Sequence, residues 1–295
     1  MIKIDGDVRL DEPMAMHTSF HIGGPADLFV APADARETAR VQAVCARESV
    51  PCFLLGGGTN ILVSDKGVRG VVVDLSRLRG ITVDGMTITA QGGTPVSDMA
   101  AAARDHGLSG LEFAFALPGS VAGAVWMNAR CYDAEIADLL TSVEYLGADF
   151  NPCRYRMRKS DWEYKKSPFQ VIPGAIISAS FSLAPGDKDR MTAAMQDHRQ
   201  DRERKGHFLF PCAGSVFKNN RNFGAPTGKL IDSLGLKGLR AGGAQVAPFH
   251  GNIIVNVDHA RAADVLGLIE TLEREVRLRL GFALEREVIL VGEWQ

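Results

Sequence analysis

The chain has 295 residues, a length that suggests about two domains. Hydrophobic residues make up 46% and charged residues 23%, which excludes disorder along the whole chain. The net charge of -2 gives no reason to expect nucleic acid or an anionic membrane as a partner. No apolar run approaches the roughly 18 residues of a membrane span, and the first residues contain no signal-peptide core. We therefore predict a soluble cytoplasmic protein.

Cysteine and glycine usage narrow the class further. The cysteines are odd in number, widely spaced and without a CxxC pair, which predicts scattered buried thiols rather than a disulfide framework or a zinc site: Cys45, Cys52, Cys131, Cys153 and Cys212. The histidines form no ligand motif, so no metal is predicted. Glycine occurs 31 times, whereas average usage near 7% would give about 21. This excess predicts many tight turns or a close approach of backbone to a ligand.

The first part of the chain reads as short strands alternating with helices. In chain order, the sequence predicts a helix over 33–49, strands over 52–55, 61–63 and 68–75, a hairpin over 81–89, and a helix over 95–106 that ends at Gly107. A dense, irregular region of small residues follows over 110–129.

The remainder mixes the same kinds of element. It predicts strands over 141–147 and 175–183, a charged helix over 188–205, a helix over 227–234, a strand over 252–257, a helix over 261–280 and a strand over 284–291. Pro185-Gly186-Asp187 interrupts the pattern, and we place the main domain boundary near 185–190. The predicted class is α+β or mixed α/β.

Three glycine-rich segments, 56–60, 92–93 and 117–123, stand out in the first part. Consecutive glycines let amide N–H groups converge on an anion, and a diphosphate is the natural occupant. Ordinary tight turns remain the alternative for any one of them. None is a Rossmann fingerprint, because Gly56-Gly57-Gly58 leads into another apolar run. Residues 224–230 lack the spacing and final Ser/Thr of a P-loop, and we predict a turn there with Thr227 capping the next helix.

Eight segments, in order along almost the whole chain, resemble motifs of the UDP-N-acetylenolpyruvoylglucosamine reductase family. They are 17–26, 54–65, 107–112, 117–128, 213–219, 230–238, 250–256 and 284–288. The resemblance implies a two-lobed FAD-binding domain of the PCMH/vanillyl-alcohol-oxidase type over 1–187, with lobes of roughly 1–75 and 76–187. It also implies a smaller α/β substrate-binding domain over 188–295. About fifty residues separate Tyr164 from Ser215, as in the shorter members that lack an inserted tyrosine loop.

The resemblance also implies a reaction and its partners. NADPH reduces FAD, and the reduced flavin reduces UDP-N-acetylglucosamine enolpyruvate to UDP-N-acetylmuramate in peptidoglycan synthesis. The expected partner is this UDP-sugar, without nucleic acid or membrane, and the chain is expected to be a monomer or a weak homo-oligomer. Two alternatives stay open: a flavoenzyme of the same fold with another substrate, and a relative that binds without turnover.

Site residues are carried over by position from the family motifs. Ser215 matches the proton donor, Glu287 the catalytic glutamate, and Lys165 the place of a catalytic arginine. Because Glu287 would act beside a carboxylate, its role predicts a raised pKa. The residues expected to bind FAD are Gly56, Gly57, Gly58, Thr59, Asn60, Gly92, Pro118, Gly119, Ser120 and Gly123, and those expected to bind substrate are Lys218, Asn219 and His250.

Simpler interpretations exist for these residues, and the chain also departs from the family pattern. Ser215, Glu287 and His250 are each compatible with an ordinary turn, surface or loop position. Lys165 keeps the positive charge of the family arginine but loses its planar fork. Activity then requires either that one point charge suffices or that an arginine such as Arg156 or Arg158 reaches in. Arg130 puts bulk and charge where the family has glycine.

Overall fold

A computed structural model describes residues 4–294, and they form two compact units. Unit 1 takes in the chain up to Leu10, Leu28–Gly57 and Gly70–Gln200. Unit 2 takes in Asp11–Asp27, Gly58–Arg69 and the chain from Asp201 onward. The chain therefore passes between the units several times, whereas the ranges expected from the sequence, 1–187 and 188–295, divide it once.

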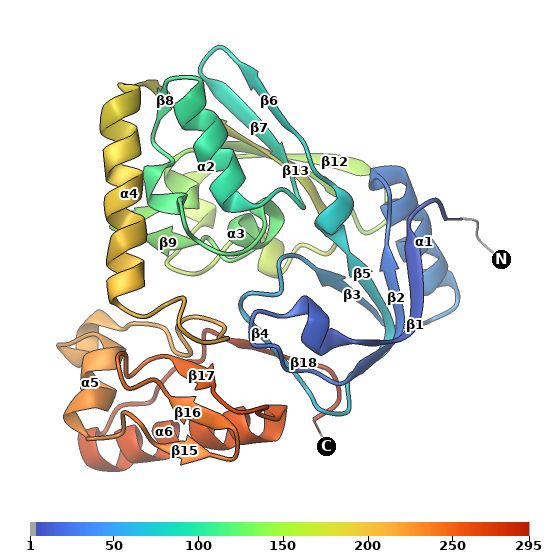
Figure 1. Cartoon of the computed structure of the whole chain (residues 1–295). Helices are drawn as coiled ribbons and strands as arrows, with labels where there is room; N and C mark the ends of the chain where they lie inside the picture. The colour runs from blue at the N-terminus through green and yellow to red at the C-terminus, as the bar shows by residue number, and fades with distance from the viewer. Residues whose placement is uncertain (1–3, 295) are drawn as a thin grey trace. The chain divides into compact units, whose positions relative to one another are not determined.

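A five-stranded antiparallel sheet forms the centre of unit 1 (Figure 1). Its order is β12 (Pro152–Arg156), β11 (Leu140–Leu146), β13 (Ile176–Ser182), β7 (Thr87–Gln91) and β6 (Ile81–Asp84). One face carries buried apolar side chains such as Val143 and Phe181, and α2 (Val96–Asp105) and α3 (Val121–Trp126) share this core. The other face carries mainly hydroxyls, including Thr89 and Ser180, whose Oγ atoms lie 2.8 Å apart. This alternation is typical of an antiparallel sheet with one face packed on a core.

A second sheet has the order β1-β2-β5-β3. Its strands are β1 (Asp7–Pro13), β2 (Pro25–Ala31), β5 (Val68–Asp74) and β3 (Cys52–Leu55), and β3 runs parallel to β5. Helix α1 (Ala35–Arg47) precedes β3 and begins at Asp34, whose carboxylate accepts the Glu37 N–H at 2.8 Å. The first glycine segment follows β3 directly.

Unit 2 contains a small antiparallel sheet of β15 (Arg240–Ala241), β16 (Ala244–Val246) and β17 (Ile254–Asn256). Helix α6 (Ala262–Leu280) packs on it with buried residues at helical spacing, namely Val265, Leu268, Ile269, Leu272 and Val276. A separate parallel pair joins β4 (Ile61–Val63) to β18 (Ile289–Val291). Helix α5 (Thr227–Ser233) also belongs to unit 2. The charged helix α4 (Lys188–Arg204) belongs to unit 1 up to Gln200, and unit 1 also contains the short strands β8 (Leu108–Ser109), β9 (Arg130–Cys131), β10 (Ala134–Glu135) and β14 (Ala184–Pro185).

Most expected elements are confirmed, and the exceptions have identifiable causes. The expected strand over 284–291 is regular only from Ile289, because 285–288 bonds irregularly with 216–218. The cap expected at Thr227 is wrong: Pro226 occupies the N-cap position, and the Thr227 hydroxyl donates to the Lys218 carbonyl at 2.9 Å. The expectation of buried thiols fails at Cys52, which is exposed.

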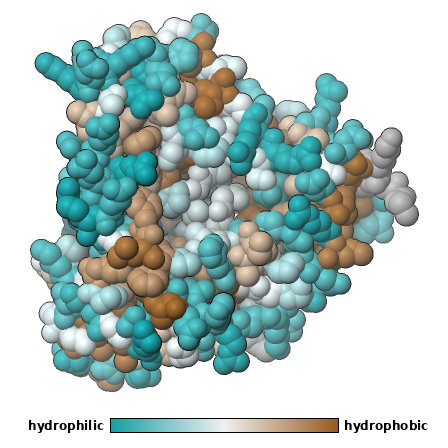
Figure 2. Space-filling view, in the orientation of Figure 1, coloured by the Kyte–Doolittle hydropathy of each residue, from teal (hydrophilic) through white to brown (hydrophobic). Residues whose placement is uncertain are grey.

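The surface view agrees with the composition. Its visible face is mostly hydrophilic, with small apolar patches (Figure 2). Among residues 4–294, no helix is both long and apolar enough to cross a membrane.

Candidate active site

In unit 1, Gly56 and Gly57, which follow β3, lie against a second loop at residues 118–120. A Cβ placed on Gly57 would lie 2.6 Å from the Gly119 Cα, and one on Gly56 would lie 2.7 Å from the Ser120 Oγ. Contacts this short leave no room for a side chain, so glycine is required where the two backbones meet. Gly57 and Pro118 are nevertheless solvent-exposed, which leaves the loops accessible to a ligand.

The two loops carry backbone donors that the protein does not use. Within residues 4–294, the N–H groups of Gly57, Gly119 and Ser120 in unit 1 donate to no acceptor. Clusters of such N–H groups bind anions, and phosphate oxygens accept several hydrogen bonds at once. These loops therefore fit the diphosphate of a dinucleotide such as FAD.

Gly92 and Gly123 support these loops through the backbone. The Gly92 N–H donates to the Ile177 carbonyl at 2.7 Å, and the Gly92 carbonyl accepts the Ala122 N–H at 2.8 Å. The Gly123 N–H donates to the Ser120 Oγ at 3.3 Å. Both backbone groups of Gly92 are thus engaged within the protein, and its contribution to a ligand site is to hold the start of α3.

In unit 2, residues 215–218 lie between two other segments. On one side, the Val216 N–H donates to the Asn252 carbonyl at 2.9 Å. On the other, the Glu287 N–H donates to the Val216 carbonyl at 2.7 Å. Ser215 and Glu287, 72 positions apart in the sequence, are therefore brought together through Val216.

Ser215 and Glu287 are both partly buried. Within residues 4–294, the Ser215 hydroxyl has no hydrogen-bond partner, so it is available to a ligand. The Glu287 backbone is held on both sides, because its carbonyl also accepts a hydrogen bond from Asn60 Nδ2 at 3.0 Å. Asn60 also accepts the Ile289 N–H at 3.0 Å through its own carbonyl. Within this unit, the end of the first glycine loop is thus tied to the predicted catalytic glutamate.

The expected substrate contacts begin next to Ser215. Lys218 Nζ pairs with Glu285 Oε1 at 2.6 Å, with most of the lysine side chain buried. The Asn219 Oδ1 accepts the Thr227 N–H at 2.9 Å. Both side chains are therefore held in place by protein contacts, which orients them before any ligand arrives.

His250 lies in the turn before β17. Its Nδ1 accepts the Asn252 N–H at 3.2 Å, which places the proton of the neutral ring on Nε2. The ring centroid lies 6.0 Å from that of His207. Burial lowers the pKa of both histidines, that of His207 to about 4. Both rings are thus neutral at neutral pH.

Sequence reasoning missed Asn252, which positions the segment 216–217 next to Ser215. Its side chain is buried, accepts the Phe217 N–H at 3.0 Å and donates to the Phe217 carbonyl at 2.8 Å. The side-chain amide of Asn252 thereby satisfies both backbone groups of Phe217, as a neighbouring strand would. The only signal in the sequence is a polar residue directly before the apolar run 253–255.

Lys165 lies in unit 1, at a tight turn bounded by Glu163 and Lys166, and has a left-handed φ of 58°. The turn is held by Asn128, whose Nδ2 donates to the Glu163 carbonyl at 2.9 Å. The Arg130 guanidinium lies over the Tyr164 ring, 6.0 Å from its centroid. Arg130 also pairs loosely with Asp133 and Glu135 at 3.6 and 3.8 Å. The cationic residues Lys165 and Arg130 therefore both belong to the structure around the turn at residues 163–166.

Comparisons with known proteins cover both parts of the chain. The family described as UDP-N-acetylenolpyruvoylglucosamine reductase, C-terminal domain, matches residues 205–291, and an FAD binding domain family matches residues 26–149. The UDP-N-acetylenolpyruvoylglucosamine reductase of Treponema denticola is 44% identical, over 98% of this chain and 95% of that protein. The reductase of Caldanaerobacter subterraneus subsp. tengcongensis is 40% identical over the same shares. The crystal structure of the Thermus caldophilus enzyme is 31% identical, with a TM-score of 0.82 over 98% of this chain and all of that one. On this evidence the chain belongs to the UDP-N-acetylenolpyruvoylglucosamine reductase family.

Proposed function

We propose that this chain reduces UDP-N-acetylglucosamine enolpyruvate to UDP-N-acetylmuramate in peptidoglycan synthesis, with FAD as cofactor and NADPH as reductant. The observation that carries the proposal is the pairing of Ser215 and Glu287 across Val216 in a chain of this family. Flavin chemistry is supported by the unused N–H groups of the two loops.

FAD would be held by the segment Gly56–Asn60 together with Pro118, Gly119 and Ser120, with Gly92 and Gly123 supporting these loops. When bound, FAD would supply the two-electron redox chemistry that couples oxidation of NADPH to reduction of the enol ether. The role of the chain's backbone is to neutralise the diphosphate without a cationic side chain, because oriented N–H dipoles stabilise the anion.

Addition of hydride to the enol ether leaves carbanion character on the carbon next to the carboxylate. That carbon must then receive a proton, and we assign the donor role to the Ser215 hydroxyl. A serine hydroxyl is a weak acid, so the role requires tight positioning, and the hydrogen bonds of Val216 and Phe217 to Asn252 supply it. Glu287 would act beside it as a hydrogen-bond partner.

Negative charge that develops on the substrate needs a cation. We assign Lys165 to the substrate carboxylate, where a point charge replaces the forked guanidinium of the family. Arg130 lies beside the same turn and supplies a guanidinium there. Arg158, by contrast, is bound to Asp161 at 3.1 Å.

The remaining roles are assigned from the positions of residues in the family motifs. Lys218, Asn219 and His250 would contact the UDP-sugar, and the chain would act as a monomer or weak homo-oligomer. The nucleotide substrates and free thiols support a cytoplasmic location. We assign the FAD-binding role to the part of the chain before α4 and the substrate role to the part after it.

Two spectroscopic measurements test the proposal. The purified protein should be yellow and should show flavin absorbance, and NADPH oxidation should depend on the enolpyruvyl sugar. A protein that stays colourless after FAD is added would contradict the proposal. Turnover with another acceptor alone would indicate a different flavoenzyme, and normal binding without turnover, even in Lys165→Arg, would indicate a binding protein.

A further inference from the structure

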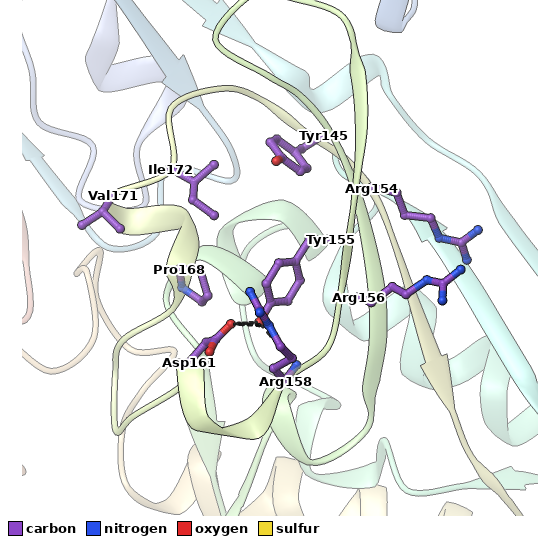
Figure 3. Close-up of a pocket in the computed structure, with 9 residues that line it drawn as sticks. All are labelled: Tyr145, Arg154, Tyr155, Arg156, Arg158, Asp161, Pro168, Val171 and Ile172. Atoms are coloured by element: carbon purple, nitrogen blue, oxygen red, sulfur yellow. Dashed lines mark hydrogen bonds and ion pairs between the residues drawn. The ribbon is translucent and has the colours of Figure 1, made fainter.

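A cavity of about 740 Å³ in unit 1 lies along the outer edge of β12, where the proposed function assigns no role (Figure 3). Its lining combines arginines from β12 and the residues after it with apolar side chains from the segment 168–172. The lining residues are Tyr145, Arg154, Tyr155, Arg156, Arg158, Asp161, Pro168, Val171 and Ile172. The edge thus has charged groups and apolar groups next to exposed backbone.

The backbone of β12 offers hydrogen bonds at this edge. Among residues 4–294, β12 is the outermost strand of its sheet and pairs only with β11, in the register Val143 to Tyr155. The Met157 N–H donates to the Thr141 carbonyl on β11 at 2.9 Å. Because the direction of N–H and C=O alternates along a strand, those of Arg154 and Arg156 point away from β11. The edge therefore has the backbone groups that an added strand would use.

Side chains on the two sides of this edge differ in character. In Figure 3, Arg154 and Arg156 project to one side of β12, while Tyr155, Pro168, Val171 and Ile172 lie on the other. Val171 is 85% exposed. Arg156 has no ion pair within residues 4–294, and Arg154 donates to the Ser142 hydroxyl at 3.1 Å. The nearby acids are Asp161, which is bound to Arg158, and Glu144, which stands opposite Arg154 in the register.

We propose that the β12 edge binds an extended acidic segment of a partner protein, which adds to the sheet as a further strand. Side chains of such a strand alternate between its two faces. One set would therefore be acidic, to meet Arg154 and Arg156, and the other apolar, to meet Val171 and Ile172. The predicted recognition pattern is alternating acidic and apolar residues.

Two other occupants fit this edge less well. A second copy of the chain, paired through the same edge, would place the arginine rows beside each other, and like charges destabilise a strand pair. A nucleotide would need an open aromatic face. Tyr145 and Tyr155 instead both make edge contacts with Phe169 at 5.5 Å, and the Tyr155 hydroxyl is bound to Asp161.

A peptide titration tests the proposal. The probe is a fluorescein-labelled octapeptide of alternating glutamate and valine, followed by fluorescence anisotropy with the full chain. The control probe is the same octapeptide with lysine in place of glutamate. We expect the glutamate–valine peptide to bind saturably and at least about tenfold more tightly than this control, and added salt should weaken its binding. The variant R154E/R156E should raise Kd at least about tenfold, whereas R204E/R274E, with the same change in net charge on α4 and α6, should not. Should R154E/R156E not fold, R154Q/R156Q serves with a smaller expected loss.

N-methylated probes separate strand addition from simple charge attraction. One probe is methylated at the glutamate N–H groups and the other at the valine N–H groups. Each probe therefore loses the N–H donors along one edge of the extended peptide and keeps its charge. Strand addition predicts that one probe loses binding and the other keeps it. Three results would overturn the proposal. They are equal binding of the two N-methylated probes, an equal loss of affinity in R154E/R156E and R204E/R274E, and no saturable binding of the glutamate–valine peptide. NADPH oxidation should be the same in all variants, so the outcome is independent of the proposed enzymatic function.

Discussion

At the scale of single residues, the role proposed for Ser215 separates two half-reactions. Its hydroxyl is needed only when substrate carbon is protonated, so Ser215→Ala should leave flavin reduction by NADPH unchanged. Reoxidation of the flavin by substrate should slow by about 10²–10⁴-fold. Anaerobic stopped-flow absorbance measures both steps. Ser233→Ala, at an exposed hydroxyl that donates to the Leu230 carbonyl, is the matched control. If both half-reactions fell together in Ser215→Ala, the assigned role would be wrong.

Lys165 and Arg130 define a second test at this scale. If they share one task, Arg130→Gly should lower kcat/KM by about tenfold or more, and Lys165→Ala by about 10²–10³-fold. The swap R130G/K165R should recover most of the activity, because it returns a guanidinium to the turn at Tyr164. Steady-state kinetics with FAD bound supplies the measurement. A swap no better than Arg130→Gly alone would show that the two cations have separate roles.

At the scale of elements, the contact between the two glycine loops predicts the effect of one methyl group. An alanine at position 57 would meet the Gly119 Cα at 2.6 Å, so the loops must separate. We expect Gly57→Ala to weaken FAD binding at least about tenfold, a loss near 1.4 kcal/mol. Flavin fluorescence titration measures it. Gly267→Ala in α6, where an added Cβ meets nothing within 4 Å, should leave FAD affinity unchanged and stabilise the fold by about 0.5–1 kcal/mol. Unchanged affinity in Gly57→Ala would remove this loop from the cofactor site.

The histidine pair beside β17 predicts a pH dependence of stability. Burial lowers the pKa of His207 to about 4, whereas the unfolded side chain titrates near 6.5. Between these values the unfolded state binds more protons, so stability falls as pH drops from about 6.5 to about 4. His207→Gln should lose less stability than the wild type between pH 7.5 and 5, as measured by urea midpoints. The exposed control His259→Asn should behave as the wild type, and equal pH sensitivity in His207→Gln would show that His207 is not the cause.

The elements also show where sequence reasoning succeeds. The strands over 52–55 and 61–63 were predicted with their observed bounds, because turn-forming residues bound both apolar runs: Pro51 and Gly56 the first, Asn60 and Ser64 the second. β12 was not expected, because arginines at alternate positions leave its pattern poorly hydrophobic. Helix α3 is only six residues long, and the sequence analysis predicted no helix there, only an irregular region over 110–129. Elements with weak local patterns owe their structure to neighbours distant in sequence, and such contacts leave no local signal.

At the scale of the whole molecule, motif resemblance predicted the family and the FAD-binding and C-terminal domain types, which the comparisons confirm. It did not predict the physical supports of the candidate site. Asn252 holds Phe217 and Asn60 holds Glu287 across 35 and 227 positions, and no periodicity relates such residues. The glycine excess has several causes: Gly57 allows two loops to meet, whereas Gly92 serves backbone packing.

The five thiols allow a test that involves the entire chain. All are free cysteines, and burial raises the pKa of Cys45 and Cys212. Because the thiolate is the reactive form, these two should react slowly with Ellman's reagent at pH 8 in the native protein. In urea, where the side chains regain ordinary pKa values near 8.5, all five should react rapidly. Cys45→Ser should leave the slow phase of the native protein one thiol smaller. Rapid reaction of all five thiols without urea would contradict the protection by burial, and fewer than five in urea without reductant would reveal a disulfide.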